Sequence, residues 1–286
     1  MKKILITGAH SFIGTSVEQW LLSNKGAYSV DTVDTMNDAW KQADFTQYDV
    51  VFHVAGIAHV DPKPEMAPLY YKVNRDLTIE IARHAKQAGV KQFVFMSSQI
   101  VYHASKSLKG TVIDKNTLPQ PNDFYGDSKW QAEKGLNELA TANFKVVNLR
   151  PCMIYGTNGK GNFQRLARLA LKTPVFPLWH NQRSMLYIDN LCEFVKQAID
   201  HELSGTFHLQ NKEYADTVEI VRYYAKANHH RLWCTRLFNP LVWLGSFFLT
   251  PLCKMFANQY YTQDLTTYDF NYQLVSFNES LKRIQL

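Results

Sequence analysis

The chain has 286 residues, of which 46% are hydrophobic and 20% charged, and 31 Lys and Arg against 25 Asp and Glu give a formal net charge of +6. This balance is typical of a globular protein and excludes a disordered chain, a collagen and a disulfide-rich miniprotein. The four cysteines stand far apart with no metal-ligand spacing, so we expect a reduced, cytoplasmic protein without a metal site. The basic residues form no long run, which argues against nucleic acid and favours a small polyanionic ligand.

The first half of the chain alternates short apolar runs with amphipathic segments. Strands are predicted at residues 3–7, 28–33, 49–55, 92–96 and 145–149. Helices are predicted after the first strand, with Ile13, Val17 and Leu21 on one face, and at 66–88 and 125–142. Strand–helix alternation of this kind predicts right-handed βαβ units, and therefore an α/β fold with a doubly wound parallel sheet.

The second half loses this rhythm after Arg150-Pro151. A loop at 156–162 precedes predicted helices at 163–172, 188–200 and 217–227, with a strand at 206–210. We interpret residues 1–156 as the sheet domain, to which 185–210 return, and residues 157–184 and 211–286 as a smaller α/β cap that binds substrate. Residues 237–253 carry no charge and include two prolines. They are predicted to pack within the cap or on a partner subunit, and the alternative is a weak contact with a membrane surface.

A glycine-containing turn follows the first strand. In Gly8-Ala9-His10-Ser11-Phe12-Ile13-Gly14, Gly8 would allow the tight turn and Gly14 would let the helix pack closely on the strand. Backbone N–H groups of Ser11, Phe12 and Ile13 at the helix N-terminus would then bind a pyrophosphate. Ser11 stands where a dinucleotide-binding turn usually has its middle glycine. The alternative interpretation is an ordinary strand–turn–helix with two structural glycines.

An aspartate at the end of the second strand would bind the ribose of an adenosine. Asp34 lies twenty residues after Gly14, and Asp31 competes for the role because strand alternation directs the two to opposite faces. No Arg stands beside Asp34 to hold a 2′-phosphate. NAD is therefore favoured as cofactor, with NADP as the alternative.

Tyr125 and Lys129 lie four residues apart on a predicted helix and so share a face. A nearby ammonium group stabilises a phenolate, which would bring the pKa of the tyrosine toward the neutral range. Ser98 follows a buried strand and lies 27 residues upstream of Tyr125, at the sheet edge where α/β proteins bind ligands. These three residues are the predicted catalytic set.

The chain resembles the extended short-chain dehydrogenase/reductases, in particular the NAD-dependent epimerase/dehydratase branch that acts on nucleotide sugars. The resemblance rests on the segments T-G-A-H-S-F-I-G (7–14), D-V-V-F-H-V-A-G (49–56), V-N (73–74), F-M-S-S-Q-I-V-Y (95–102), Y-G-D-S-K (125–129), R-P-C-M-I-Y-G (150–156) and R-S-M-L-Y-I-D-N-L (183–191). It implies a Rossmann-like NAD-binding domain with a substrate-binding cap, and a homodimer.

The resemblance also implies roles for individual residues. Tyr125 would be the general acid/base, Lys129 would lower its pKa and hold the nicotinamide ribose, and Ser98 would orient the sugar oxygen. The further cofactor residues would be Asp44 and Phe45 beside the adenine, Ala55 and Gly56 along the cofactor, and Asn74 in support. The substrate residues would be Asn162 and Arg183 on the nucleotide diphosphate, with Arg231 as an additional phosphate ligand.

Two activities remain open within the family. Dehydratases carry an acidic pair after the catalytic hydroxyl, where this chain has Gln99 and Ile100, so dehydration is disfavoured. The first activity is 4-epimerisation of a UDP-hexose or UDP-N-acetylhexosamine through a 4-keto intermediate, and the alternative is reduction of a UDP-4-keto-6-deoxy-sugar in surface polysaccharide synthesis. A third hypothesis is a non-catalytic NAD(P)-binding regulator, which the presence of both Tyr125 and Lys129 disfavours.

Overall fold

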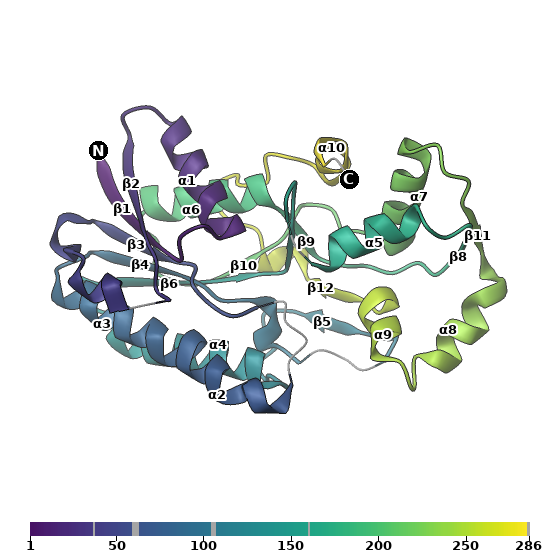
Figure 1. Cartoon of the computed structure of the whole chain (residues 1–286), viewed down its shortest axis with the longest axis horizontal. Coiled ribbons are helices and arrows are strands. Elements are labelled where there is room, and N and C mark those ends of the chain that lie inside the picture. Colours follow the sequence, from purple (N-terminus) through teal and green to yellow (C-terminus); the bar gives the residue numbers. More distant parts are fainter. Residues whose placement is uncertain (37, 59–62, 104–106, 160, 285–286) are drawn as a thin grey trace.

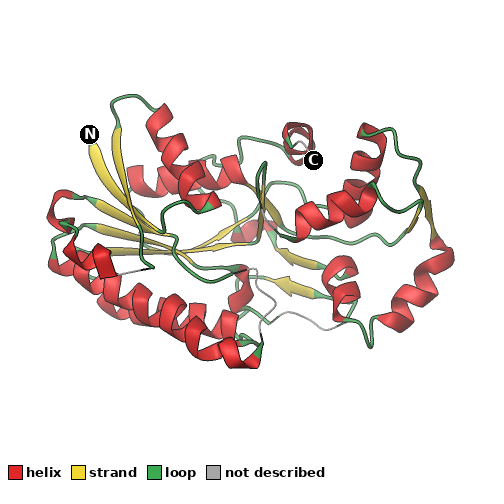
Figure 2. Ribbon diagram, viewed as in Figure 1, coloured by secondary structure: helices red, strands yellow, loops and turns green. Residues whose placement is uncertain are grey.

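The structure is a computed structural model of the chain, which describes residues 1–36, 38–58, 63–103, 107–159 and 161–284. Its centre is a sheet of six strands in the order β10-β6-β4-β3-β1-β2, with every neighbouring pair parallel. The strands are β1 (Lys2–Thr7), β2 (Tyr28–Val33), β3 (Val50–His53), β4 (Gln92–Met96), β6 (Lys145–Pro151) and β10 (Gly205–Leu209). The predicted α/β fold with a doubly wound parallel sheet is confirmed (Figures 1 and 2).

Helices cover both faces of this sheet. Helices α1 (Phe12–Ser23) and α6 (Ile188–Asp200) lie on one face, and α3 (Thr78–Gln87) and α4 (Phe124–Leu139) lie on the other (Figure 1). Strands β3 and β4 are buried along their whole length, whereas the edge strand β2 is partly exposed. This explains why the inner strands read as continuous apolar runs in the sequence.

The single helix predicted over residues 66–88 has an internal irregularity. After a 3₁₀ turn at Pro64–Met66, the chain forms α2 (Ala67–Tyr70), then a π-helical stretch at Tyr71–Leu77, and then α3. Such widened turns often lie at functional sites. Here the π-helical stretch carries Asn74, which is fully buried.

The connection between β2 and β3 holds only two short 3₁₀ segments, at Asp38–Gln42 and Phe45–Gln47. No strand occurs among its described residues, so β2 is the last strand on that side of the sheet. The chain therefore passes from β2 across β1 to β3, and the direction of winding reverses at β1 and β3. Ligands of open α/β sheets bind beyond the carboxyl ends of the strands at such a reversal.

The second half forms a group of helices with three two-stranded sheets beside the main one. The strand pairs are β5 (Thr111–Ile113) with β12 (Gln259–Tyr261), β7 (Met153–Tyr155) with β9 (Met185–Tyr187), and β8 (Val175–Pro177) with β11 (Trp233–Thr235). The helices are α5 (Asn162–Ala170), α7 (Thr217–Ala227), α8 (Asn239–Gly245), α9 (Thr250–Phe256) and α10 (Phe277–Arg283). Residues 205–209 return to the main sheet as β10. No helix of the described residues is long and apolar enough to cross a membrane.

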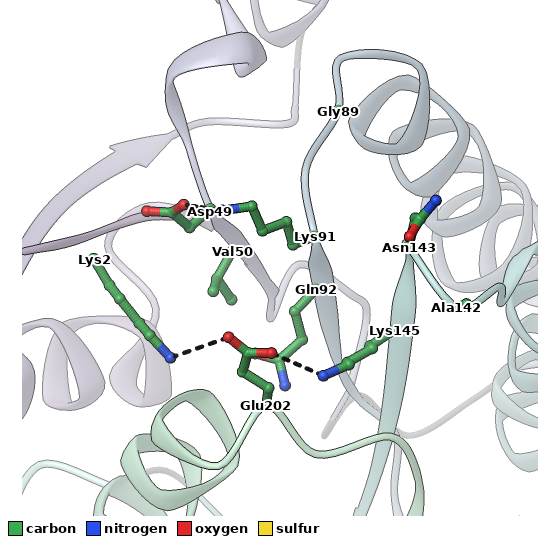
Figure 3. A pocket seen from close by; sticks show the side chains of 10 residues that line it. All are labelled: Lys2, Asp49, Val50, Gly89, Lys91, Gln92, Ala142, Asn143, Lys145 and Glu202. Carbon is green, nitrogen blue, oxygen red and sulfur yellow. Dashed lines mark hydrogen bonds and ion pairs between the residues drawn. The ribbon is translucent and has the colours of Figure 1, made fainter.

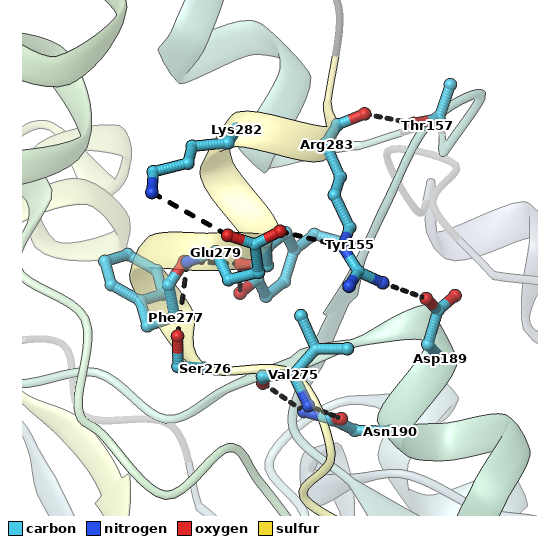
Figure 4. A network of polar contacts seen from close by, with 11 residues as sticks. Tyr155, Thr157, Asp189, Asn190, Val275, Ser276, Phe277, Glu279, Lys282 and Arg283 are labelled. Carbon is cyan, nitrogen blue, oxygen red and sulfur yellow. Dashed lines mark hydrogen bonds and ion pairs between the residues drawn. The ribbon is translucent and has the colours of Figure 1, made fainter.

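The C-terminal segment is fixed to α6 and β7 by polar contacts (Figure 4). The Asn190 side chain donates to the Val275 carbonyl and accepts from the Val275 N–H, both at 2.9 Å. Arg283 pairs with Asp189 at 3.2 Å, and the Tyr155 and Ser280 hydroxyls lie 2.6 Å apart. These contacts anchor the end of the chain to α6 and β7.

Candidate active site

The turn after β1 has the geometry of a phosphate-binding turn. Gly8 has a φ of +105°, and a Cβ atom there would lie 2.7 Å from the backbone N of Ala55, so only glycine fits. Ser11 is the N-cap of α1, and its hydroxyl accepts a hydrogen bond from the Gly14 N–H at 3.0 Å. A serine at the middle position therefore satisfies one of the unpaired N–H groups of the helix terminus.

Gly8→Ala should lower both stability and cofactor affinity. Gly205 has a similar φ of +115° but open space around it, so Gly205→Ala is a matched control that carries the backbone strain alone. We expect Gly205→Ala to lose about 1–2 kcal/mol and Gly8→Ala to lose roughly 1–3 kcal/mol more, from the clash with Ala55. Denaturant unfolding and NAD titration of both variants measure the difference. Equal losses in the two variants would contradict the close approach of Gly8 to Ala55.

A cavity of about 970 Å³ lies at the carboxyl ends of β1 and β3. Of the predicted cofactor residues, it is lined by Gly8, Ser11, Asp34, Ala55 and Gly56. Asp34 is exposed and accepts a hydrogen bond from the Met36 N–H at 2.9 Å. Asp31 instead accepts a hydrogen bond from the Tyr48 hydroxyl at 3.0 Å. The structure thus brings Asp34, and not Asp31, together with the glycine turn, in a space large enough for a dinucleotide.

Asp44 and Phe45 are not among the described residues that line this cavity. The Phe45 side chain is buried and its ring packs edge-on against His84, with ring centroids 4.6 Å apart. Asp44 caps a 3₁₀ turn by accepting from the N–H of Thr46. Asp38, Trp40 and Lys41, from the segment just before Asp44, line the cavity instead.

Asn74 holds the loop that forms one wall of the cavity. Its side-chain oxygen accepts from the Ile57 N–H at 2.8 Å, and its amide group donates to the Ile57 carbonyl and the Ser128 hydroxyl. A Cβ atom on Gly56 would lie 3.0 Å from Asn74 Oδ1 and 3.1 Å from Lys129 Nζ. Asn74, Gly56 and Lys129 are therefore packed against one another.

Ser98 and Tyr125 share a hydrogen bond at the carboxyl edge of β4. Ser98 also caps the short 3₁₀ turn Gln99–Val101 by accepting from the Ile100 N–H at 3.2 Å. A Cβ atom on Gly126 would lie 2.4 Å from the Ile100 carbonyl oxygen, so glycine after Tyr125 lets α4 start directly against this turn. The sequence thus brings the two hydroxyls together through a cap and a close backbone contact.

The pKa of Tyr125 moves in the direction opposite to the sequence expectation. Burial raises it to about 12, and the hydrogen bond from Ser98 opposes this rise. The Lys129 ammonium group donates to the Met96 carbonyl at 2.9 Å. Burial lowers the pKa of Lys129 to about 8, so the amine is still mostly protonated at neutral pH.

A second cavity, of about 470 Å³, lies between α5, α9 and the β7–β9 pair. Asn162, Arg165, Arg183 and Lys254 are among its lining residues, and no Asp or Glu is found among the described residues that line it. Arg183 is held by backbone hydrogen bonds to Ala215, and its guanidinium donates to the Lys254 carbonyl. Burial lowers the pKa of Arg183 to about 10, which leaves it charged. Three cations without a carboxylate favour an anionic ligand such as a diphosphate.

Arg231, which was predicted to bind substrate phosphate, is not among the described residues that line this cavity. The cavity contains Thr217 at the first residue of α7, whereas Arg231 follows the other end of that helix, which is about 16 Å long. Arg231 is exposed. Arg165, which the sequence interpretation missed, takes the place on the cavity wall. Its position three residues after Asn162, on the same face of a helix, is the signal that could have identified it.

A third cavity, of about 420 Å³, lies at the opposite, amino edge of the sheet (Figure 3). Its charges compensate one another. Glu202 pairs with Lys145 at 2.8 Å and with Lys2 at 4.0 Å, and Asp49 pairs with Lys91 at 3.2 Å. Ligands of parallel sheets bind at the carboxyl edge, so we do not place a functional site here.

A buried ionic network joins α4 to β6. Glu133 of α4 is fully buried and pairs with Arg150 of β6, the closest contact being 2.5 Å. Ser97 donates to the same carboxylate, and Arg150 also donates to the Tyr102 hydroxyl at 2.6 Å. The Tyr102 hydroxyl in turn lies 2.7 Å from His208 Nε2. Glu133 is one helical turn from Lys129, so the network fixes α4 at the point where it carries this lysine.

Comparisons with known proteins agree with this geometry. A profile of the NAD dependent epimerase/dehydratase family matches residues 4–209. The chain is 32% identical over 270 residues to the UDP-glucose 4-epimerase of Vibrio cholerae, covering 84% of this chain and 82% of the relative. It is 25% identical over 274 residues to the N-acetyl-alpha-D-glucosaminyl-diphospho-ditrans,octacis-undecaprenol 4-epimerase of Escherichia coli O157:H7, covering 90% and 82%. The crystal structure of UDP-N-acetylglucosamine 4-epimerase from Bacillus cereus superposes with a TM-score of 0.70 at 20% identity, covering 99% and 98%.

Proposed function

The chain belongs to the NAD dependent epimerase/dehydratase family, and we propose that it is a 4-epimerase of a UDP-linked hexose or N-acetylhexosamine. The observation that carries the proposal is the position of Ser98, Tyr125 and Lys129. They lie at the carboxyl edge of the sheet, and the chain also carries a dinucleotide-sized cavity and a cationic cavity free of acids. Both relatives described above are 4-epimerases, which supports this choice over reduction.

The residues of the larger cavity fit an NAD molecule. Gly8, Ser11 and Gly14, with the N–H groups of Phe12 and Ile13, would hold the pyrophosphate, and Asp34 would accept hydrogen bonds from the adenosine ribose. Ala55 and Gly56 would line the cofactor on the wall that Asn74 supports. When bound, NAD takes up and returns the hydride of the sugar C4 and adds a positive charge beside the phenol.

Tyr125 moves the proton of the reaction. Its phenolate oxygen accepts the proton of the sugar C4 hydroxyl during oxidation and returns it during reduction. Ser98 donates a hydrogen bond to the same sugar oxygen. The hydrogen bond between Ser98 and Tyr125 supports this role, because it keeps the two hydroxyl groups close together. Lys129, whose ammonium group lies against Gly56, would hold the ribose hydroxyls of the bound cofactor. Re-addition of the hydride to the other face of the 4-keto sugar inverts C4.

Arg183 binds the substrate diphosphate, and Arg183→Gln should raise KM for the nucleotide sugar. Loss of a charge-assisted contact to a phosphate costs about 2–4 kcal/mol, or roughly 30- to 1000-fold in kcat/KM. Arg231→Gln, the same change at an arginine outside the cavity, is the control and should leave KM within about two-fold. Steady-state kinetics of both variants give the comparison. A larger effect at Arg231 than at Arg183 would contradict the placement of the diphosphate.

A coupled assay of the purified protein tests the proposed activity. UDP-glucose, UDP-galactose and the corresponding UDP-N-acetylhexosamines are incubated with and without added NADH or NADPH. Formation of the C4 epimer without net change in nicotinamide absorbance supports epimerisation. Product that appears only with stoichiometric loss of the reduced cofactor contradicts it and identifies the reductase. Bound NAD without conversion of any of these sugars contradicts it in favour of a non-catalytic binding protein.

A further inference from the structure

An apolar face lies at the end of the cap. Six large apolar side chains of α8 and the following turn are exposed, and we call them the apolar face: Leu241, Trp243, Leu244, Phe247, Phe248 and Leu249. They make up six of the fifteen exposed large hydrophobic residues of the described chain, within nine consecutive positions. The other side of α8 packs inward through the buried Val242. Contiguous exposed apolar surface of this kind marks an interaction site.

The charge around this face is one-sided. Between Glu219 and Asp264 the sequence has no acidic residue and five Lys and Arg. Residues 157–184 and 211–286 together carry thirteen Lys and Arg against six Asp and Glu, while the remaining residues carry eighteen against nineteen. Arg231, Arg236 and Lys254 are exposed, and none of them forms an ion pair with a described residue. The positive surplus of the whole protein therefore lies in the part of the sequence that contains the apolar face, and Arg236 and Lys254 flank this face along the chain.

The position of the face relates it to the substrate cavity. Figure 1 shows α8 at the end of the molecule opposite to β1 and β2. Phe248 and Leu249 lead directly into α9, whose Pro251, Lys254 and Met255 line the cationic cavity. A surface that covered the apolar face would thus lie next to the mouth of the proposed diphosphate site.

We propose that the apolar face docks on the surface of an anionic lipid bilayer. Aromatic and aliphatic side chains beside unpaired basic residues are the composition of interfacial membrane contacts. Anionic headgroups attract Arg231, Arg236 and Lys254, which we call the basic rim. The apolar side chains enter the boundary between headgroups and acyl chains. Trp243 and Phe247, whose rings pack edge to face with centroids 5.0 Å apart, form the centre of the contact. Docking in this way holds the substrate cavity at the membrane surface.

Vesicle co-sedimentation tests the proposal. The wild-type protein should bind vesicles of phosphatidylcholine with about one third phosphatidylglycerol. It should bind phosphatidylcholine alone much more weakly, because the basic rim then has no anionic headgroups to contact. Phe247→Ser/Phe248→Ser, at side chains that are 65% and 80% exposed, should reduce binding about ten-fold or more. Leu118→Ser, at an exposed leucine outside the face, is the matched control and should bind like the wild type.

Two outcomes would overturn the proposal. One is equal vesicle binding, or none, by the wild type and the double variant. The other is a wild-type oligomer that the double variant loses while neither protein binds vesicles, which would make a second copy of the chain the occupant. Epimerisation of soluble UDP-sugars is measured on the same proteins and should be unchanged by Phe247→Ser/Phe248→Ser. Failure of the docking proposal is therefore separate from failure of the proposed activity.

Discussion

Tyr125→Phe should reduce turnover by about 10³-fold while leaving NAD affinity nearly unchanged. Removal of a general acid/base group typically lowers the rate by 10²- to 10⁴-fold, because no other group takes the proton at that atom. The aromatic ring, which packs 5.8 Å from the ring of Tyr70, is retained in phenylalanine, so the fold should persist. Turnover of the epimerisation substrate and NAD titration of the same sample measure the two effects separately.

Tyr70→Phe is the matched control for this substitution. Tyr70 is buried beside Tyr125, and its ring packs on Phe124 with centroids 4.9 Å apart, so it shares the environment without touching Ser98 in the described contacts. Turnover of Tyr70→Phe should stay within about two-fold of the wild type. Retention of more than about a tenth of wild-type turnover by Tyr125→Phe would remove Tyr125 from the proposed proton transfer.

The pH dependence of turnover follows from the same residue. Because burial raises the pKa of Tyr125 to about 12, the phenol is protonated throughout the neutral range unless nearby positive charge lowers that value. We therefore expect turnover of the wild-type protein to rise with pH on its acidic side, as the phenolate becomes populated. Lys129, whose own pKa is lowered to about 8, would lose its charge in the same direction and limit the rise above that pH.

Local motifs singled out Gly8, Ser11 and Asp34, and the structure brings these three residues together around one cavity. Ser11 contacts Gly14 within the same turn, so this geometry is contained in the local sequence, whereas Gly8 approaches Ala55 after β3 only once the sheet has formed. Strand alternation left Asp31 and Asp34 as alternatives. The structure separates them through Tyr48, which is close to Asp31 only after the segment between β2 and β3 has folded.

Residues whose positions depend on tertiary packing could not be predicted in this way. Phe45 follows a plausible aspartate, yet its ring is needed in the core beside His84. Arg231 is near the cap in sequence, but the length of α7 carries it away from the cavity that Thr217 lines. The three-residue strands of the cap form through pairing with distant segments, as β5 does with β12, and they carry too few residues for a periodic signal.

Glu133→Gln should lower the free energy of unfolding by about 3–5 kcal/mol. Glu133 is fully buried and its carboxylate accepts from Arg150 at 3.0 Å, at 3.2 Å and at 2.5 Å, so an uncharged amide leaves a buried guanidinium without its counter-charge. Glu279→Gln, at an exposed carboxylate that pairs with Lys282 and Arg283 on α10, is the control and should lose less than about 1 kcal/mol. Denaturant unfolding measures both.

The double variant Glu133→Leu/Arg150→Met separates the cost of an unpaired charge from the value of the pair. Replacement of a buried ion pair by apolar residues of similar size is often neutral, so the double variant should be more stable than Glu133→Gln, even though Tyr102 loses the hydrogen bond from Arg150. Equal losses would mean that the network stabilises the fold through its own hydrogen bonds.

Because Glu133 also raises the pKa of Lys129 one turn away, its removal should shift the loss of activity at high pH to a lower pH. The buried pair would then stabilise α4 and also keep Lys129 charged. A pair with a purely structural role would leave the pKa of Lys129 unchanged.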